Sequence, residues 1–253
     1  MKQTSVRKKI ELLLGALLVA GSAMWAYGET LSNLLVWDSV HYLYMHENRI
    51  SNLSVENIYW MMTSLEESNW HPLTWLSWAI DYQIYGGLDS WGYHFSNNIL
   101  HSINSVLVFA LMLVIFNLTS PDSKSYQIKT NNFSLVAAVL TASMFAVHPH
   151  HVESVAWVAE RKDLLCQLFM LLSILAYVKY VTCRKNSKTG WYLATLGLFS
   201  LALLSKPMAV TFPVILLLFD VYPLRRSALV QPVFTSIQRQ SFLRLVMEKT
   251  PFI

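Results

Sequence analysis

The chain is poor in charged residues and in cysteine, and both shortages narrow its class. Only 13% of its 253 residues are charged, against about a quarter in ordinary soluble domains, which excludes a soluble α/β enzyme. Its two cysteines, Cys166 and Cys183, have neither metal-ligand spacing nor the pattern of a disulfide framework, so we interpret them as buried thiols. The alternating segments of about ten residues that build outer-membrane barrels are also missing from the sequence.

Long apolar runs are what the sequence has instead. Hydrophobic residues make up 54% of the chain, and the mean hydropathy is +0.39. The runs approach the length that crosses about 30 Å of hydrocarbon as a helix, so we predict an all-α polytopic membrane protein with about six transmembrane helices. These spans are predicted near 10–27, 98–118, 133–147, 163–181, 191–204 and 208–222. Residues 1–222 then form the transmembrane domain, and 223–253 form a cytoplasmic segment leading to a seventh span that the chain lacks.

The basic residues predict how the chain is oriented. The net charge of +4 does not point to a nucleic-acid partner. With six spans and an inner N-terminus, most Lys and Arg residues fall in cytoplasmic segments, as the positive-inside rule requires. The first apolar run follows a basic head. We favour a retained helix over a cleaved signal peptide, because the run is long for a signal core and has no clean A-x-A site.

The predicted outer loop, 28–92, is too polar to span a membrane but is rich in Trp and Tyr. Within it, His71–Gly86 has apolar residues at helical spacing and an aromatic belt, which predicts an interfacial helix. The same arrangement puts all 8 histidines and most of the acids at or near the outer face. Titratable groups gathered on one side favour a catalytic or binding face, with a plain solvated surface as the alternative.

The densest polar cluster runs from Ala146 to Leu165, where the chain leaves one predicted span and enters the next. Arg161 and Lys162 suit a phosphate there, Arg as a bidentate fork and Lys as a point charge. Anchoring to lipid headgroups is the alternative. A zinc site in the His-Pro-His-His run, completed by Glu153, is less favoured, because Pro149 and the adjacent histidines do not give the helical i, i+4 ligand spacing. We therefore predict no metal.

Further candidates lie at the same predicted depth. Lys206, beside a helix-breaking proline, can point outward to the site, and a snorkelling lysine without a ligand is the alternative. Asp38, just outside the first span, is placed to act as general base on an acceptor hydroxyl, against the alternative of an ordinary surface carboxylate. The donor-phosphate set is Arg161, Lys162, His148, His151 and Lys206, and the other site candidates are Glu47, His71, Asp81 and Glu153.

Three stretches closely resemble the membrane half of the bacterial transmembrane and tetratricopeptide-repeat proteins, whose animal relatives are O-mannosyltransferases. They are Asn69–Phe109, which begins NWHPLTWLSWAIDYQIYG, Phe145–Tyr180, which begins FAVHPHHVESVAWVAERKDLL, and Leu203–Arg226, which reads LLSKPMAVTFPVILLLFDVYPLRR. The resemblance implies a glycosyltransferase of the C-type fold in the bacterial inner membrane. It further implies an enzyme that takes a sugar from a polyprenyl phosphate donor, needs no other cofactor, and transfers the sugar to an acceptor protein on the outer face.

Two departures from the family pattern bear on activity. The family has a paired Asp-Asp in the first outer loop, where this sequence has Val40 and His41 ahead of Glu47 and Asn48, so Asp38 matches only through a gap. No period of about 34 residues is visible, so the sequence contains no tetratricopeptide repeats. We therefore expect a truncated transferase that transfers little or no sugar, with a non-catalytic membrane scaffold or repeat anchor as the alternative. A transporter ranks third, because its ionisable groups should lie at mid-membrane.

Overall fold

The computed structural model of the chain describes residues 2–66, 69–119, 131–183, 187–227 and 242–252. Every regular element in these ranges is helical, which confirms the predicted all-α class. The helices of the main stack are α1 (Lys2–Tyr27), α6 (Ser90–Thr119), α7 (Asn132–Ala146), α9 (Arg161–Thr182), α10 (Lys188–Ser205) and α11 (Phe212–Val221). The remaining elements are η1 (Gly28–Ser32), α2 (Asp38–Tyr44), α3 (Glu47–Ile50), α4 (Val55–Thr63), α5 (Pro72–Tyr85), η3 (Pro149–His151), α8 (Val152–Ala156), η4 (Val158–Glu160), η6 (Pro207–Thr211), α12 (Phe242–Glu248) and η7 (Thr250–Phe252).

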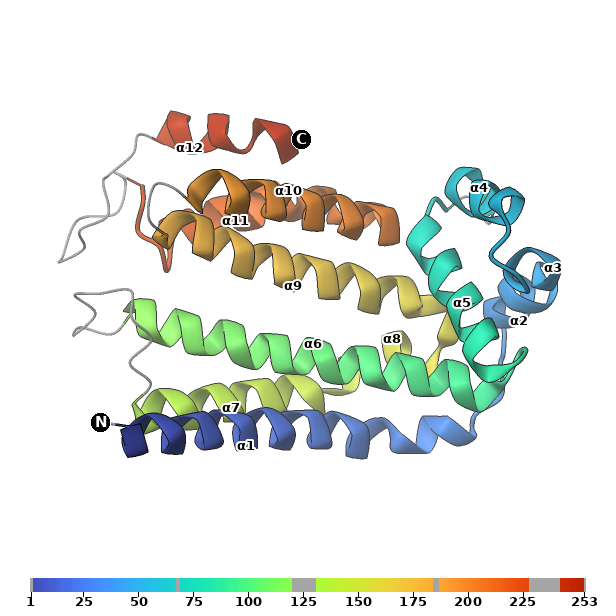
Figure 1. Ribbon diagram of the computed structural model, residues 1–253, viewed down its shortest axis with the longest axis horizontal. Coiled ribbons are helices and arrows are strands. Elements are labelled where there is room, and N and C mark those ends of the chain that lie inside the picture. Colours follow the sequence, from blue (N-terminus) through green and yellow to red (C-terminus); the bar gives the residue numbers. More distant parts are fainter. Residues whose placement is uncertain (1, 67–68, 120–130, 184–186, 228–241, 253) are drawn as a thin grey trace.

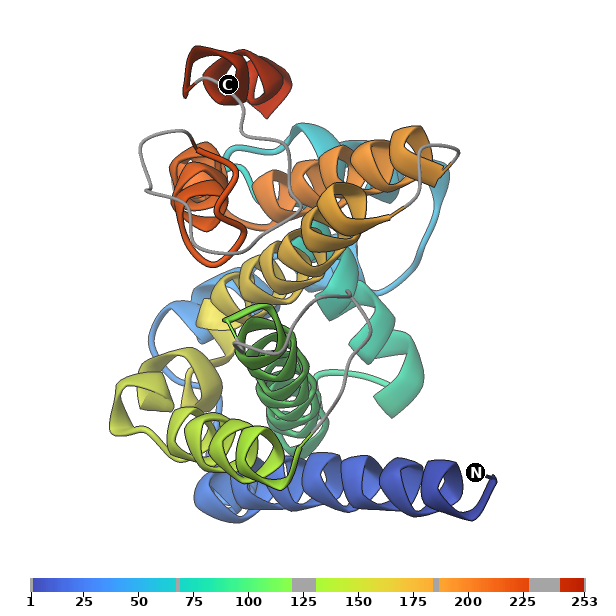
Figure 2. The ribbon, with the colours of Figure 1, turned by 90° about the vertical axis from the view of Figure 1, so that its left-hand side faces the viewer.

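The helices form a stack that is elongated along one axis (Figure 1). In that view α1 and α7 lie at the bottom, followed upward by α6, α9, and then α10 with α11, while α12 lies at the top. Figure 2, which looks along the long axis, shows α1 crossing beneath α6 and α7. The short helices α2 to α5 gather at one end of the stack, where α6 and α9 begin. We refer to it as the α2–α5 end.

The predicted count of about six spans is wrong for the described part of the chain. Three helical stretches are long and apolar enough to cross a membrane, namely Val6–Ser32, Ser90–Thr119 and Val158–Thr182. The pair Asn132–Ala146 and Pro149–Ala156, bent by 46°, makes a fourth if it counts as one span. The helix α10 begins with polar and aromatic residues that lower its hydropathy. The stretch Pro207–Val221 is too short, since a crossing needs about 20 helical residues. The architecture is therefore that of a multi-pass helical membrane protein with three or four candidate spans.

The predicted interfacial helix is confirmed as a helix, α5, but its two tryptophans pack inside the protein. It ends at Gly86, whose φ of 73° is the left-handed conformation that closes many helices. Trp75 and Trp78 are fully buried. A Cβ atom at Gly92 would lie 2.3 Å from the ring of Tyr85, so glycine allows α6 to begin close against α5.

A row of buried polar side chains on α6 fixes the segment that carries the candidate site. Asn97, His101 and Asn104 contact carbonyl oxygens of α8, α7 and α9 at 3.2, 2.9 and 2.9 Å respectively. Hydrogen bonds of this kind between helices hold membrane bundles together. The row therefore positions the chain from the end of α7 to the start of α9 against one long helix.

Candidate functional site

Two segments far apart in the sequence lie side by side at the α2–α5 end. Their contacts pair Trp37 with Trp157, Ser39 with Ala159 and Tyr42 with Lys162. The Ala159 amide donates to Ser39 Oγ at 3.1 Å, and the Lys162 ammonium lies 5.9 Å from the centre of the Tyr42 ring. All three pairs have the same sequence separation of 120 residues. The start of α2 therefore runs in register with η4 and the start of α9.

Four charged side chains converge beside this contact, and we refer to Glu160, Lys162, Asp163 and Lys206 as the Glu160 cluster. The Lys162 Nζ atom lies 2.8 Å from Glu160 Oε1, and the Lys206 Nζ atom lies 3.5 Å from Oε2 of the same carboxylate. Lys206 also pairs with Asp163. The exposed fractions of the four side chains run from 12% to 32%. The charges are therefore partly shielded from water and still accessible.

The end of α10 delivers Lys206 to the cluster. The helix stops at Ser205, Lys206 has an extended backbone, and the following proline starts η6. The Thr74 hydroxyl donates to the Ser205 carbonyl at 3.4 Å, which links α5 to the end of α10. Burial lowers the pKa of Lys206, but the Asp163 and Glu160 carboxylates raise it more, so this pKa lies above its ordinary value. The ammonium is therefore charged at neutral pH.

His71 is a buried imidazole close enough to feel the charge of Lys162. Its ring stacks on Trp75 with centroids 5.7 Å apart and meets Tyr42 edge-on at 5.5 Å. The side chain is buried, and neither ring nitrogen has a hydrogen-bond partner among the residues that the structure describes. Burial, followed by repulsion from Lys162, lowers the pKa of His71 to about 4. His71 is therefore neutral at pH 7.

Arg161 is directed into the protein interior rather than toward the Glu160 cluster. Its Nη1 atom lies 2.5 Å from Asp81 Oδ2, Nε donates to Asn97 Oδ1 at 2.7 Å, and Nη2 donates to the Tyr93 carbonyl at 2.7 Å. All three guanidinium nitrogens are engaged, and they join α9 to α5 and α6. A cavity of about 330 Å³ between these three helices is lined in part by Arg161 and Asp81. Arg161 is therefore a buried link between the three helices.

The other predicted carboxylates lie at the surface. Asp38 is exposed at the start of α2, one residue before Ser39. Glu47 is exposed at the start of α3 and accepts a hydrogen bond from the Tyr82 hydroxyl at 2.9 Å. Glu153 is exposed in the first turn of α8. Of these three, Asp38 belongs to the segment that contacts the start of α9.

His148 and His151 belong to a separate group of rings at the bend between α7 and α8. The Tyr27 hydroxyl donates to the His148 carbonyl at 2.7 Å, and the His151 ring lies 5.1 Å from that of His101. Within the described ranges, no contact joins this group to the Glu160 cluster. In the same ranges, no three His, Cys, Asp or Glu side chains are arranged to hold a metal ion.

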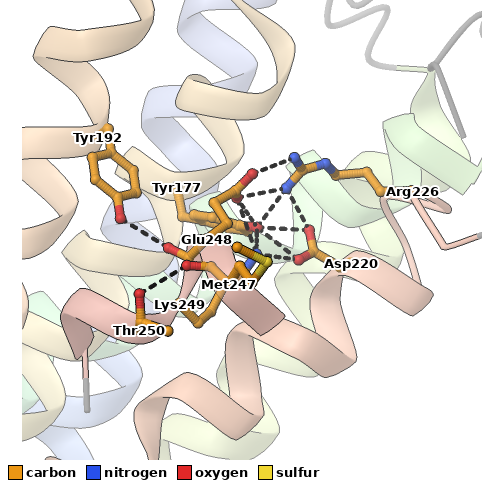
Figure 3. Close-up of polar contacts among 8 residues, drawn as sticks. All are labelled: Tyr177, Tyr192, Asp220, Arg226, Met247, Glu248, Lys249 and Thr250. Carbon is orange, nitrogen blue, oxygen red and sulfur yellow. Dashed lines mark hydrogen bonds and ion pairs between the residues drawn. The ribbon is translucent and has the colours of Figure 1, made fainter. Parts of the chain in front are cut away.

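A second charged cluster is buried where α9, α11 and the α12 segment meet (Figure 3). The Asp220 carboxylate, fully buried, accepts from the Tyr177 hydroxyl at 2.7 Å and pairs with Lys249 and with Arg226, the latter at 2.9 Å. Arg226 also pairs with Glu248 at 2.8 Å. The side chains of Asp220, Arg226 and Lys249 are at most 5% exposed, well below those of the Glu160 cluster, and this deep burial fits a structural role. Part of the predicted cytoplasmic segment, 228–241, lies outside the described residues.

Sequence reasoning missed several partners in both clusters. Glu160 and Asp163 stand within the predicted polar run, and their spacing around Lys162 was the available signal for ion pairs. The pairing of Trp37 with Trp157 has no signal along the sequence. The second cluster joins an apparently ordinary helix end to charges near the end of the chain, so only folding reveals it.

Membrane-length helices and a half-buried charged cluster at one end define the class, a multi-pass membrane protein with a candidate site at the α2–α5 end. Residues 124–237, a little under half of the chain, match the family described as dolichyl-phosphate-mannose-protein mannosyltransferase. The chain is 35% identical over 167 residues to Protein O-mannosyl-transferase TMTC4 of Homo sapiens, covering 64% of this chain and 22% of that protein.

Two further relatives match the chain with similar identity and coverage. Protein O-mannosyl-transferase Tmtc2 of Drosophila melanogaster is 32% identical over 174 residues, covering 66% of this chain and 17% of the relative. Protein O-mannosyl-transferase tmtc2 of Xenopus laevis is 30% identical over 171 residues, covering 66% and 18%. The chain thus spans about a fifth of the length of these curated relatives. No solved structure matches it. These relatives are animal proteins, so the bacterial source and the link to tetratricopeptide repeats stay predictions.

Proposed function

We propose that this chain carries the membrane part of a glycosyltransferase that moves a sugar from a polyprenyl phosphate donor to a protein hydroxyl. The observation that carries the proposal is the convergence of Lys162 and Lys206 on one half-buried carboxylate, Glu160. Two ammonium groups so placed suit a phosphate. Preorganised donors aimed at developing negative charge contribute about 3 kcal/mol each in shielded sites.

The comparisons support the class of reaction. The family match and the names of the relatives favour mannose as the sugar and a protein as the acceptor. A polyprenyl or dolichyl phosphate is the donor that the family description implies. No resident cofactor or metal enters the proposal.

The chemistry needs a place for the leaving phosphate and a base for the acceptor. The acceptor oxygen attacks the anomeric carbon, the bond from that carbon to the phosphate oxygen breaks, and the hydroxyl proton passes to a carboxylate. When the donor binds, the ammonium groups of Lys162 and Lys206 each give up a contact with a carboxylate and contact the donor phosphate instead. Asp38 is the proposed base, because it is exposed, has no hydrogen bond or ion pair from the described residues, and neighbours the Ser39 contact to η4. Arg161 holds α9 so that Lys162 faces the cluster.

The proposed orientation places the N-terminus inside and the α2–α5 end outside. With α1, α6, the bent pair and α9 as four spans, Ser51 and Ser187 fall on opposite sides of the membrane. We expect an impermeant maleimide added from outside to label Ser51→Cys and not Ser187→Cys. The reverse pattern would invert the orientation and move the proposed site to the inner face.

Donor binding tests the proposed function directly. We expect polyprenyl phosphate mannose to raise the Tm of the chain in lipid nanodiscs, because a ligand that binds the folded state stabilises it. Lys162→Met and Lys206→Met should each weaken binding by about tenfold, the loss of one charge-assisted contact. Lys188→Met, at the start of α10 and outside the cluster, is the matched control. If the wild-type chain shows no shift, the transferase proposal fails and the non-catalytic scaffold replaces it.

A further inference from the structure

Trp37 holds a backbone conformation that disfavours any residue with a side chain. Its φ is 52° and its ψ is −130°, in a region where a Cβ atom is crowded and glycine is favoured. Within the described residues, Arg225, with a φ of 51°, is the one other non-glycine residue with positive φ. Such outliers persist where the surroundings enforce them, and they concentrate at functional sites.

Burial does not explain why a tryptophan occupies this position. The Trp37 side chain is 77% exposed, so most of its apolar surface gains nothing from folding. Its contact in the protein is edge-to-face, with the Trp157 ring at 5.7 Å between centroids and 84° between planes. This arrangement supports the indole at one edge and leaves much of the ring uncovered.

The neighbouring Trp157 offers a second, independent observation. Its Nε1 atom is buried and has no hydrogen-bond partner in the described part of the chain. A buried donor without an acceptor is costly, and an indole N–H can only donate. Because this atom is shielded from solvent, an acceptor on a ligand beside Trp37 would satisfy it once the two indoles shift to admit the ligand.

We propose that Trp37 and Trp157 form a sugar-binding subsite next to the candidate base Asp38. The apolar C–H face of the donor pyranose stacks on the Trp37 indole, and one sugar hydroxyl accepts from Trp157 Nε1. A rigid aromatic face suits this role because little side-chain entropy is lost on binding. The subsite lies in register with the Glu160 cluster, which places a sugar ring beside the proposed phosphate ligands. The inference rests on the proposed function. A tryptophan at the membrane interface is the competing explanation.

The test compares two lipids on the whole chain in nanodiscs. The probes are polyprenyl phosphate mannose and the same polyprenyl phosphate without sugar, and the readouts are the Tm without lipid and the affinity for each lipid. In the wild-type chain we expect the sugar-bearing lipid to bind about tenfold more tightly, the gain expected of one aromatic contact with its hydrogen bond. Trp37→Gly should abolish that advantage, leave the binding of the sugar-free lipid unchanged, and keep or raise the Tm without lipid.

Two further variants sharpen the comparison. Trp157→Phe keeps the ring and removes the N–H group, so it should reduce the sugar advantage partly. Arg225→Gly relieves the other positive φ and should keep the full sugar advantage. Trp37→Phe keeps an aromatic face, so it should retain most of the preference for the sugar-bearing lipid. This variant keeps the subsite testable if Trp37→Gly fails to fold.

The outcomes separate this inference from the proposed function. If Trp37→Gly distinguishes the two lipids as well as the wild-type chain does, or if it lowers the Tm without lipid, then Trp37 is an anchoring or packing residue and the subsite is overturned. The transferase proposal survives that result. If the wild-type chain binds neither lipid, the proposed function fails and the subsite fails with it.

Discussion

The Arg161 guanidinium contacts the Asp81 carboxylate at 2.5 Å, with side chains 1% and 8% exposed respectively. The two residues are 80 positions apart in the sequence, so their contact fixes the start of α9 against α5. Ser96 also donates to Asp81 at 2.8 Å, which joins α6 to the same carboxylate. Three helices therefore meet at one ion pair directly beside the Glu160 cluster.

Breaking this pair should destabilise the protein strongly. Asp81→Asn and Arg161→Gln each leave a buried charge without its partner, and we expect each to lower the free energy of unfolding by about 3–5 kcal/mol. The double variant should lose much less unfolding free energy than the two single variants lose together, because it leaves no unpaired buried charge. Thermal unfolding in nanodiscs measures all three. Additive losses would show that the two side chains are not energetically coupled.

Replacement of Asp38 should impair chemistry and spare stability. Its exposed carboxylate has no partner in the described ranges, so Asp38→Asn should leave the Tm unchanged. In a preparation that transfers sugar, turnover should fall by about 10²- to 10⁴-fold, the usual contribution of a general base. The control is Glu153→Gln, another exposed acid, on α8. Unchanged turnover in Asp38→Asn would assign the base to another acid, and Glu47 is the next to test.

His71 should make stability depend on pH below neutrality. Burial and the Lys162 charge lower its pKa in the folded protein to about 4, below the value of about 6.5 in an unfolded chain. The unfolded chain therefore binds the proton more tightly, and stability is complete above about pH 6.5 and falls as pH drops toward 4, by up to roughly 3 kcal/mol.

A comparison of variants isolates that effect. Unfolding of the wild-type chain and of His71→Gln should be measured at several pH values between 4 and about 7.5. We expect the variant to show a flatter pH profile over this range. Parallel profiles would mean that His71 is not the group responsible.

The buried cluster around Asp220 should hold α12 in place. Lys249→Met removes one of the two cations that pair with the Asp220 carboxylate, and we expect a loss of about 3–5 kcal/mol of unfolding free energy. Neighbouring Glu248 has a pKa lowered to about 2, because Arg226 and Lys249 outweigh the effect of burial. Lys188→Met is again the control for charge removal. Equal Tm values for the two variants would exclude a stabilising role for Lys249.

The helices themselves were largely readable from the sequence, but the number of spans was not. Apolar residues at helical spacing and an aromatic belt predicted α5 almost to the residue. Hydropathy along the chain does not say whether a run meets lipid or protein. The same pattern that suggested an interfacial helix belongs to one whose Trp75 and Trp78 are buried within the fold. Two of the predicted spans, 191–204 and 208–222, do not qualify as membrane spans. The first lies in α10, which begins with polar and aromatic residues, and the second is too short.

The sequence by itself determined the membrane class, the positions of the long helices and the polar run before α9. Only the tertiary structure decided what each charged residue does. Arg161 and Lys162 are adjacent, yet one is buried against Asp81 and the other faces Glu160. Successive residues on a helix point about 100° apart, so neighbours in sequence meet different surroundings. Arg161 meets Asp81, which lies 80 positions earlier in the sequence. Lys162 faces Glu160, which also pairs with Lys206 at the end of another helix.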